Sequence, residues 1–72
     1  MTGICIIDRA WINDDTVPGG RKEIITYSVT TAALINNILT IYPGTAEGSF
    51  AMDVSAGDVY NLLGGVWAKI GG

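Results

Sequence analysis

Residues 58–71 read DVYNLLGGVWAKIG, and this stretch carries the strongest local folding signal in the chain. Gly64 and Gly65 can both adopt the positive φ angles of a type I′ turn without steric cost, and strand-forming residues flank them on either side. We therefore predict a β-hairpin from Asp58 to Gly71. The turn sets the register, which is expected to pair Leu63 with Val66, Leu62 with Trp67, Asn61 with Ala68, Tyr60 with Lys69, and Val59 with Ile70.

Both faces of this predicted hairpin are apolar. Side chains alternate across a sheet, so one face would carry Tyr60, Leu62, Trp67 and the stem of Lys69, and the other Val59, Leu63, Val66, Ala68 and Ile70. A sheet that is apolar on both sides must be covered on both sides, and a short chain can hardly supply three layers. We therefore predict contacts with another subunit. The candidate interface residues are Val59, Tyr60, Leu62, Leu63, Val66, Trp67 and Ile70, together with Trp11, which could equally fill the core.

The rest of the chain also indicates strands. Residues 2–12 are rich in β-branched and aromatic residues and predict one or two short strands, and residues 13–21 contain turn-forming Asn, Asp, Pro and Gly. Residues 23–31 alternate between apolar and polar types, which is the period of a strand. Residues 50–54 predict a further short strand, which a turn at residues 55–57 joins to the hairpin.

Residues 31–39 allow two interpretations. As a hairpin, Asn36 and Asn37 would form the turn, because Asn tolerates positive φ. As a helix, capped by Thr30 or Thr31, the segment would be under three turns long and would contain both asparagines. The hairpin is favoured. The predicted fold class is all-β, or mainly β, built from small antiparallel hairpins with at most one short helix and completed by oligomerisation.

Composition limits how such a fold can be stabilised. The 72 residues make a single small domain, and a chain of this length buries only about 60% of its unfolded surface. Cys5 is the sole cysteine, which excludes an internal disulfide, and the absence of histidine argues against a structural zinc site. Hydrophobic residues make up 49% of the chain and charged residues 15%. Oligomerisation is the remaining means of stabilisation, and Cys5 itself is expected to be a small buried hydrophobe.

Several functions are disfavoured by the sequence. The net charge of −3 leaves no basic patch for nucleic acid, and without histidine the serines, threonines and Cys5 lack the usual catalytic base, so neither an enzyme nor a cofactor is expected. Residues 24–46 are uncharged but hold two central asparagines, which disfavours a membrane span. Asp8, Asp14 and Asp15 could bind calcium, although solvated loop charges are favoured. No signal peptide is visible at Met1, Thr2 and Gly3, which predicts synthesis and retention in the cytoplasm until assembly.

Two segments resemble a known class of protein. Gly57-Asp58-Val59-Tyr60, followed by residues 64–71 (GGVWAKIG), is similar to a segment that recurs in bacteriophage fibres and in related surface or collagen-like proteins. Residues 29–45 resemble a second fibre segment, with Asn37-Ile38 and Pro43 where Gly and Asp are usual. The resemblance implies a virion protein that decorates or stabilises a capsid, tail or fibre, with copies of itself, often as trimers, and other virion proteins as partners. The alternatives are a small soluble inhibitor of a host protein and a small membrane-associated protein; Tyr60 and Trp67 could otherwise stack on a host sugar.

Overall fold

The computed structural model describes residues 3–72, so the predicted strand start at Thr2 and the features read from Met1 and Thr2 lie outside the described residues. The described strands form one sheet in chain order: β1 (Ile4–Asn13), β2 (Arg21–Val29), β3 (Phe50–Asp53), β4 (Asp58–Leu63) and β5 (Val66–Gly71). A 3-10 helix, η1 (Ala32–Asn37), continues directly into the short helix α1 (Ile38–Ile41). The prediction of a mainly β fold with one short helix is confirmed.

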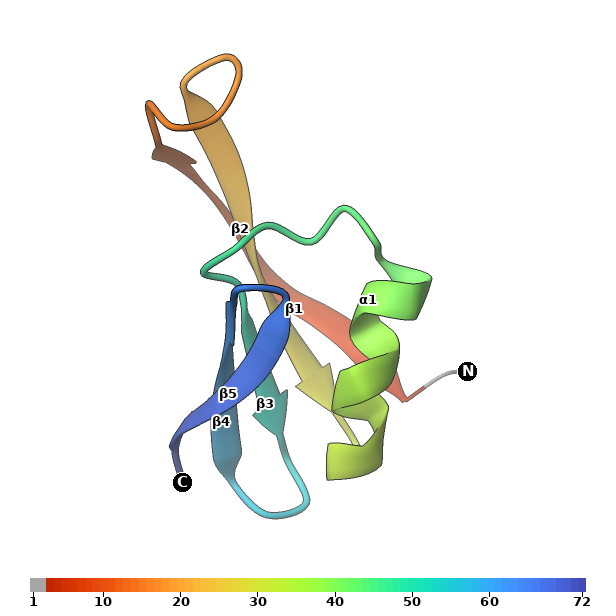
Figure 1. Cartoon of the computed structure of the whole chain (residues 1–72). Helices are drawn as coiled ribbons and strands as arrows, with labels where there is room; N and C mark the ends of the chain where they lie inside the picture. Colours follow the sequence, from red (N-terminus) through yellow and green to blue (C-terminus); the bar gives the residue numbers. More distant parts are fainter. Residues whose placement is uncertain (1–2) are drawn as a thin grey trace.

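The helical segment covers one face of the sheet (Figure 1). The pairs β1–β2, β3–β4 and β4–β5 are antiparallel, whereas β2 and β3 are parallel. Parallel neighbours need a crossover connection, and residues 30–49 supply it, with η1 and α1 inside it. The architecture is therefore two layers, a sheet and a helical segment, and the sequence analysis did not anticipate the parallel pair.

The C-terminal hairpin forms as predicted. Gly64 and Gly65 have φ angles of 60° and 78°, as a type I′ turn requires. The first four predicted pairs, from Leu63 with Val66 to Tyr60 with Lys69, are present. The fifth is displaced, because a β-bulge makes Ile70 an extra residue and places Val59 opposite Gly71.

The favoured hairpin at Asn36 and Asn37 is wrong, and the helical alternative is right. Among the described residues, positive φ angles occur at glycines alone, so neither asparagine forms a type I′ turn. The helical conformation places Ile35 and Ile38 three positions apart on one face, where both are buried. This burial outweighs the weak helix propensity of asparagine. Thr31 occupies the N-cap position, but its side chain makes no capping hydrogen bond.

The core lies between the helical segment and the sheet. Its fully buried cluster contains Ile4, Tyr27, Val29, Ile35, Ile38 and Ala51. The Tyr27 ring lies 5.4 Å from that of Tyr42 and 6.5 Å, edge to face, from that of Trp67. The Thr45 hydroxyl donates to the carbonyl of Tyr42 at 2.7 Å, so Tyr27 donates its own hydroxyl hydrogen to Thr45 Oγ1 at 2.6 Å. Tyr27 therefore joins β2, β5 and the crossover connection.

The turn between β3 and β4 is held by a buried aspartate. Asp53 is 2% exposed, and its Oδ1 accepts hydrogen bonds from the backbone N–H of Ser55 at 3.0 Å and from the Ser55 hydroxyl at 2.6 Å. The Asp53 carbonyl also accepts from the N–H of Gly57, whose φ is 72°. The predicted turn at residues 55–57 is thus confirmed, and it is closed by a carboxylate that belongs to the strand before it.

Candidate interaction surface

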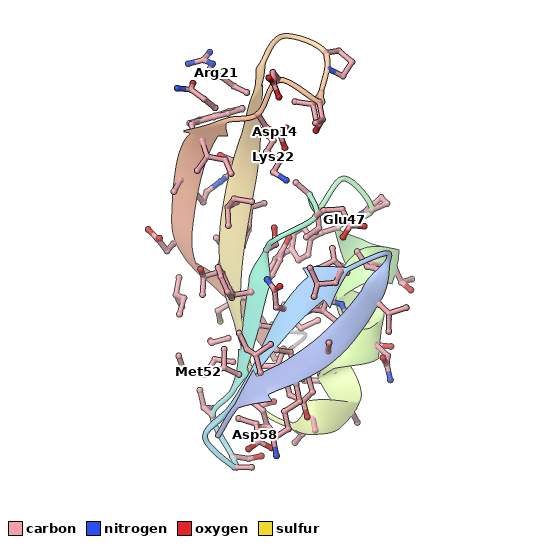
Figure 2. The ribbon with its side chains drawn as sticks, turned by 60° about the vertical axis from the view of Figure 1, so that its left-hand side comes forward. Asp14, Arg21, Lys22, Glu47, Met52 and Asp58 are labelled. Carbon is pink, nitrogen blue, oxygen red and sulfur yellow. The ribbon has the colours of Figure 1, made fainter. Side chains whose placement is uncertain are left out.

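The face of the sheet opposite the helical segment is open. Strand register places alternate residues of β3, β4 and β5 on this face, and no helix or strand among residues 3–72 lies over it. Met52, in the central strand, points to the side away from the helix (Figure 2). We define the open-face patch as the apolar residues that β3, β4 and β5 contribute to this face: Phe50, Met52, Val59, Leu63, Val66 and Ala68.

The patch is exposed at one end and half-buried at the other. Leu63 and Val66, which pair directly, are 55% and 65% exposed, and Phe50 is 36% exposed. Met52 and Val59, also a direct pair, are half-buried. Adjoining exposed apolar side chains such as Leu63 and Val66 are a feature of interaction sites.

The open-face patch carries no charge. By register, Asp53, Asp58 and Lys69 belong to the covered side of the sheet, where Lys69 Nζ lies 3.4 Å from Asp58 Oδ1. Asn61 is a polar residue that lies on the same face, between the patch residues Val59 and Leu63. Its Nδ2 donates hydrogen bonds to the carbonyls of Gly48 and Ser49 at 3.0 and 3.1 Å. Because Asn61 already has partners within the chain, a covering molecule could exclude water from the patch without leaving this amide nitrogen unsatisfied.

The predicted interface residues divide between the two faces. Leu62 is 2% exposed, and Tyr60 and Trp67 pack against the chain's own core, so most of their apolar area is used inside one subunit. The open face holds the remainder: Val59, Leu63 and Val66, with Ile70 exposed at the adjacent bulge. The sequence pattern correctly separated the two sets but gave no indication of which one the helix would cover.

Trp11 and Cys5 are both exposed. Trp11 is 63% exposed on β1 with the guanidinium of Arg21 5.5 Å from its ring centre, so it is not a core residue. Cys5 was expected to be buried, and this is wrong. Cys5 pairs with Ser28 on the uncovered side of an edge strand, where neither the helical segment nor another strand covers it.

The outer part of the β1–β2 hairpin, from Arg9 to Glu23, projects beyond the rest of the fold, and we call it the arm (Figure 1). Across its strands, Arg9 binds Glu23 through two hydrogen bonds, Nε to Oε2 at 3.2 Å and Nη2 to Oε1 at 2.9 Å. The hydrogen bonds to the Glu23 carboxylate raise the pKa of Arg9. This bidentate pair fixes the strands of the arm relative to each other.

Asp14 organises the loop at the tip of the arm. Its Oδ1 accepts hydrogen bonds from the N–H and the hydroxyl of Thr16, and its Oδ2 lies 3.0 Å from Lys22 Nζ. These contacts, led by the Thr16 hydroxyl, lower the pKa of Asp14 from 3.8 to about 2. Within residues 3–72 the structure brings together no group of three or more His, Cys, Asp or Glu residues that could hold a metal ion.

We expect the titration of Asp14 to depend on both of its side-chain partners. Thr16→Val and Lys22→Gln should each raise the pKa of Asp14 toward 3.8, because the Thr16 hydroxyl and the Lys22 ammonium group both stabilise the ionised carboxylate. A lowered pKa means that the folded state releases this proton more readily than the unfolded state. The stability from Asp14 is therefore present above about pH 4 and is lost as the pH falls toward 2. NMR titration of the carboxyl carbon measures the pKa in each variant, and an unchanged pKa in both variants would contradict the assignment.

Glu47 binds the turn of the C-terminal hairpin from the crossover connection. Its two carboxylate oxygens accept hydrogen bonds from the backbone N–H groups of Gly64, at 2.7 Å, and Gly65, at 2.9 Å. Figure 2 shows Glu47 beside this turn. Sequence reasoning missed the contact, because Glu47 is 17 positions from Gly64 and no local pattern connects them.

Glu47→Ala should lower the free energy of unfolding by about 1 kcal/mol, because two charge-assisted hydrogen bonds are replaced by hydrogen bonds to water at an exposed site. Amide hydrogen exchange at Gly64 and Gly65 should become faster. Glu47→Gln is the matched control, which keeps one acceptor oxygen and should lose less stability. Urea denaturation and hydrogen exchange measure the two effects, and unchanged exchange in Glu47→Ala would show that the contact does not hold the turn.

Comparisons with known proteins yield no match among family models, curated proteins or solved structures. Within residues 3–72, no helix has both the length and the hydrophobicity needed to cross a bilayer.

Proposed function

We propose that this chain is a non-enzymatic structural component of a bacteriophage particle, which decorates or stabilises a capsid, tail or fibre through the open-face patch. The observation that carries the proposal is the patch itself, with Leu63 and Val66 more than half exposed at its end. Its partners are copies of the chain and other virion proteins, and its location is the virion. The proposal also rests on the resemblance of residues 57–71 to a fibre segment, in which the glycine turn and its flanking strands form the hairpin that contributes most of the patch.

The surface area shows how compact the single chain is. The accessible surface is 4409 Å², close to the roughly 4,300 Å² expected for a folded chain of 7.6 kDa. The chain is thus as compact as an ordinary monomer. What supports association is the set of large hydrophobic residues that this compact chain leaves exposed, which includes Phe50, Leu63 and Val66 of the patch.

The test is the composition of particles purified from a culture that produces the chain. Density-gradient fractions should contain many copies per particle by quantitative mass spectrometry. Leu63→Lys combined with Val66→Glu should reduce incorporation, because it makes the exposed end of the patch polar, while the two opposite charges still pair across the hairpin. Ile41→Lys, an exposed apolar position on α1, is the matched control. A chain that stays out of the particle fractions would refute the proposal.

The arm supports a second candidate, a small soluble protein that inhibits or modifies a host protein. Trp11 is 63% exposed and is stacked with Arg21, and both residue types are enriched among the residues that dominate binding energy. Affinity capture with the wild-type chain and with Trp11→Ala separates the candidates. An inhibitor should bring down one host protein in a Trp11-dependent manner, whereas a particle protein should bring down virion components irrespective of Trp11.

A further inference from the structure

We infer that the outer edge of β1 pairs with the same edge of a second copy of this chain, antiparallel and around a two-fold axis at Ala10. The two arms then form one four-stranded sheet, in which the β1 strands of the two copies lie side by side between their β2 strands. The inference goes beyond the proposed function, because this contact uses the strand edge and not the open-face patch.

β1 is the less protected of the two edge strands of the sheet. β5 has six residues, contains Lys69 and is bulged at Ile70, and short length, lysine and bulges all discourage pairing with another chain. β1 has ten residues, and its Ile7, Trp11 and Ile12 are 53%, 63% and 42% exposed. A long edge strand with exposed apolar side chains is a template on which another strand can pair.

The arm is the part of this edge that gains most from a second copy. It consists of β1, β2 and the loop between them, and it projects beyond the rest of the fold (Figure 1). A two-stranded ribbon is at best marginally stable in water, whereas three or more strands support one another. Pairing two arms gives each β1 a strand on both sides, and the partner is a chain that is always present.

The hydrogen bonds of the arm indicate which backbone groups of β1 point outward. At the tip, the N–H of Asp14 donates to the carbonyl of Gly20 at 2.9 Å. Successive residues of an antiparallel pair turn their backbone groups alternately toward the partner strand and away from it. The N–H and C=O groups of Arg9 and Trp11 therefore point away from β2, toward an added strand. The bulge at Ile7 precedes this segment and does not interrupt it.

The charges of β1 select Ala10 as the position of the axis. With the axis there, Arg9 lies opposite Trp11 of the second copy, on the same side of the sheet, and each such pair exchanges two backbone hydrogen bonds. A guanidinium beside an indole ring is a favourable cross-strand contact. An axis at Arg9 would instead place two guanidinium groups opposite each other. An axis at Trp11 would place Asp8 opposite Asp14 of the second copy, and like charges at such positions are destabilising.

Disulfide formation tests the register. Ala10 would face its own copy in a non-hydrogen-bonded pair, where the Cα atoms lie about 4.5 Å apart, within the range of a disulfide. In a Cys5→Ser background, Ala10→Cys should therefore give a covalently linked pair of chains under mild oxidation. Ile12→Cys, on the same face, is the matched control, because the two copies of this residue lie about 14 Å apart. No linking through position 10, or equal linking through position 12, would overturn the inference.

The oligomeric state tests whether backbone pairing holds the two copies together. Native mass spectrometry and sedimentation should give twice the 7.6 kDa mass of one chain at micromolar concentration. Trp11→Pro removes an outward N–H, so the chain should stay folded while the dissociation constant of the dimer rises about 100-fold. Trp11→Thr keeps this N–H and should raise the constant only about 10-fold. A folded wild-type monomer, a mass of three chains, or equal loss in the two variants would overturn the inference.

Amide hydrogen exchange in the wild-type chain keeps the inference testable if Trp11→Pro does not fold. The N–H groups of Arg9 and Trp11 should exchange at least about 10-fold faster when the chain is diluted below the dissociation constant of the dimer. Ala10 is the internal control, because its N–H points toward β2 and should exchange at a rate independent of concentration. Exchange at Arg9 and Trp11 that does not change on dilution would refute the strand pairing.

The inference and the proposed function fail separately. Particles that contain the chain, with an isolated chain that is monomeric, would remove the inference and leave the proposed function intact. A dimer that is linked through position 10 but is absent from particles would do the reverse.

Discussion

Tyr27→Ala is expected to remove a large part of the free energy of unfolding of the chain. Tyr27 is fully buried, and its ring contacts those of Tyr42 and Trp67. Truncating a large buried aromatic residue costs about 3–5 kcal/mol. At roughly 0.05–0.15 kcal/mol per residue, the whole chain has a stability of only about 4–11 kcal/mol. Urea denaturation, followed by near-ultraviolet circular dichroism, measures the loss.

Tyr27→Phe separates the contribution of the ring to stability from that of the hydroxyl group. The variant keeps the aromatic packing but removes the hydrogen bond to Thr45 Oγ1. We expect a loss of about 1 kcal/mol, because Thr45 retains its own bond to the carbonyl of Tyr42. If Tyr27→Phe were as destabilising as Tyr27→Ala, the hydrogen bonds that run from Tyr27 through Thr45 to Tyr42, and not the packing of the ring, would hold the crossover connection to the sheet.

The second large effect distinguishes two adjacent leucines. Leu62 is 2% exposed on the covered side of β4, and Leu63 is 55% exposed on the open side. Leu62→Ala should lower the free energy of unfolding by about 2–5 kcal/mol, whereas Leu63→Ala should change it by less than about 0.5 kcal/mol in the dissociated chain. Urea denaturation at a concentration low enough to prevent association measures both. Similar losses would show that the two faces are wrongly assigned.

The C-terminal hairpin illustrates which parts of the structure are predictable from sequence and which are not. The register around Gly64 and Gly65 follows from local turn chemistry, and four of its five predicted pairs are present. The side to which each residue of this hairpin points then follows from alternation. Whether a given side is covered depends on the crossover connection, and no local pattern specified its position.

The wrong and missing sequence-based predictions have a common physical cause, which is that tertiary contacts overruled or added to the local signals. Asn36 and Asn37 are a reasonable local turn signal, but they yielded to the burial of Ile35 and Ile38 against the sheet. Cys5 is exposed because its side chain lies on the uncovered side of an edge strand, and which side is covered is a property of the whole fold. The bond from Glu47 to the hairpin turn likewise depends on tertiary placement.

The parallel pairing of β2 and β3 has a consequence for the folding order. The β1–β2 and β4–β5 hairpins and the β3–β4 turn close through short segments, whereas β2 meets β3 only after residues 30–49 have formed a loop. Closing this loop lowers the chain entropy, and this cost is offset only after Tyr27 has formed its contacts with the crossover connection. We therefore expect residues 4–29 and 50–71 to form locally and to join late, with the encounter between these two halves limiting the folding rate. Changes within either hairpin should alter mainly the folding rate, because contacts formed before this encounter are already present in the transition state. Shortening the crossover connection should also act on the folding rate, because it lowers the entropy cost of closing the loop.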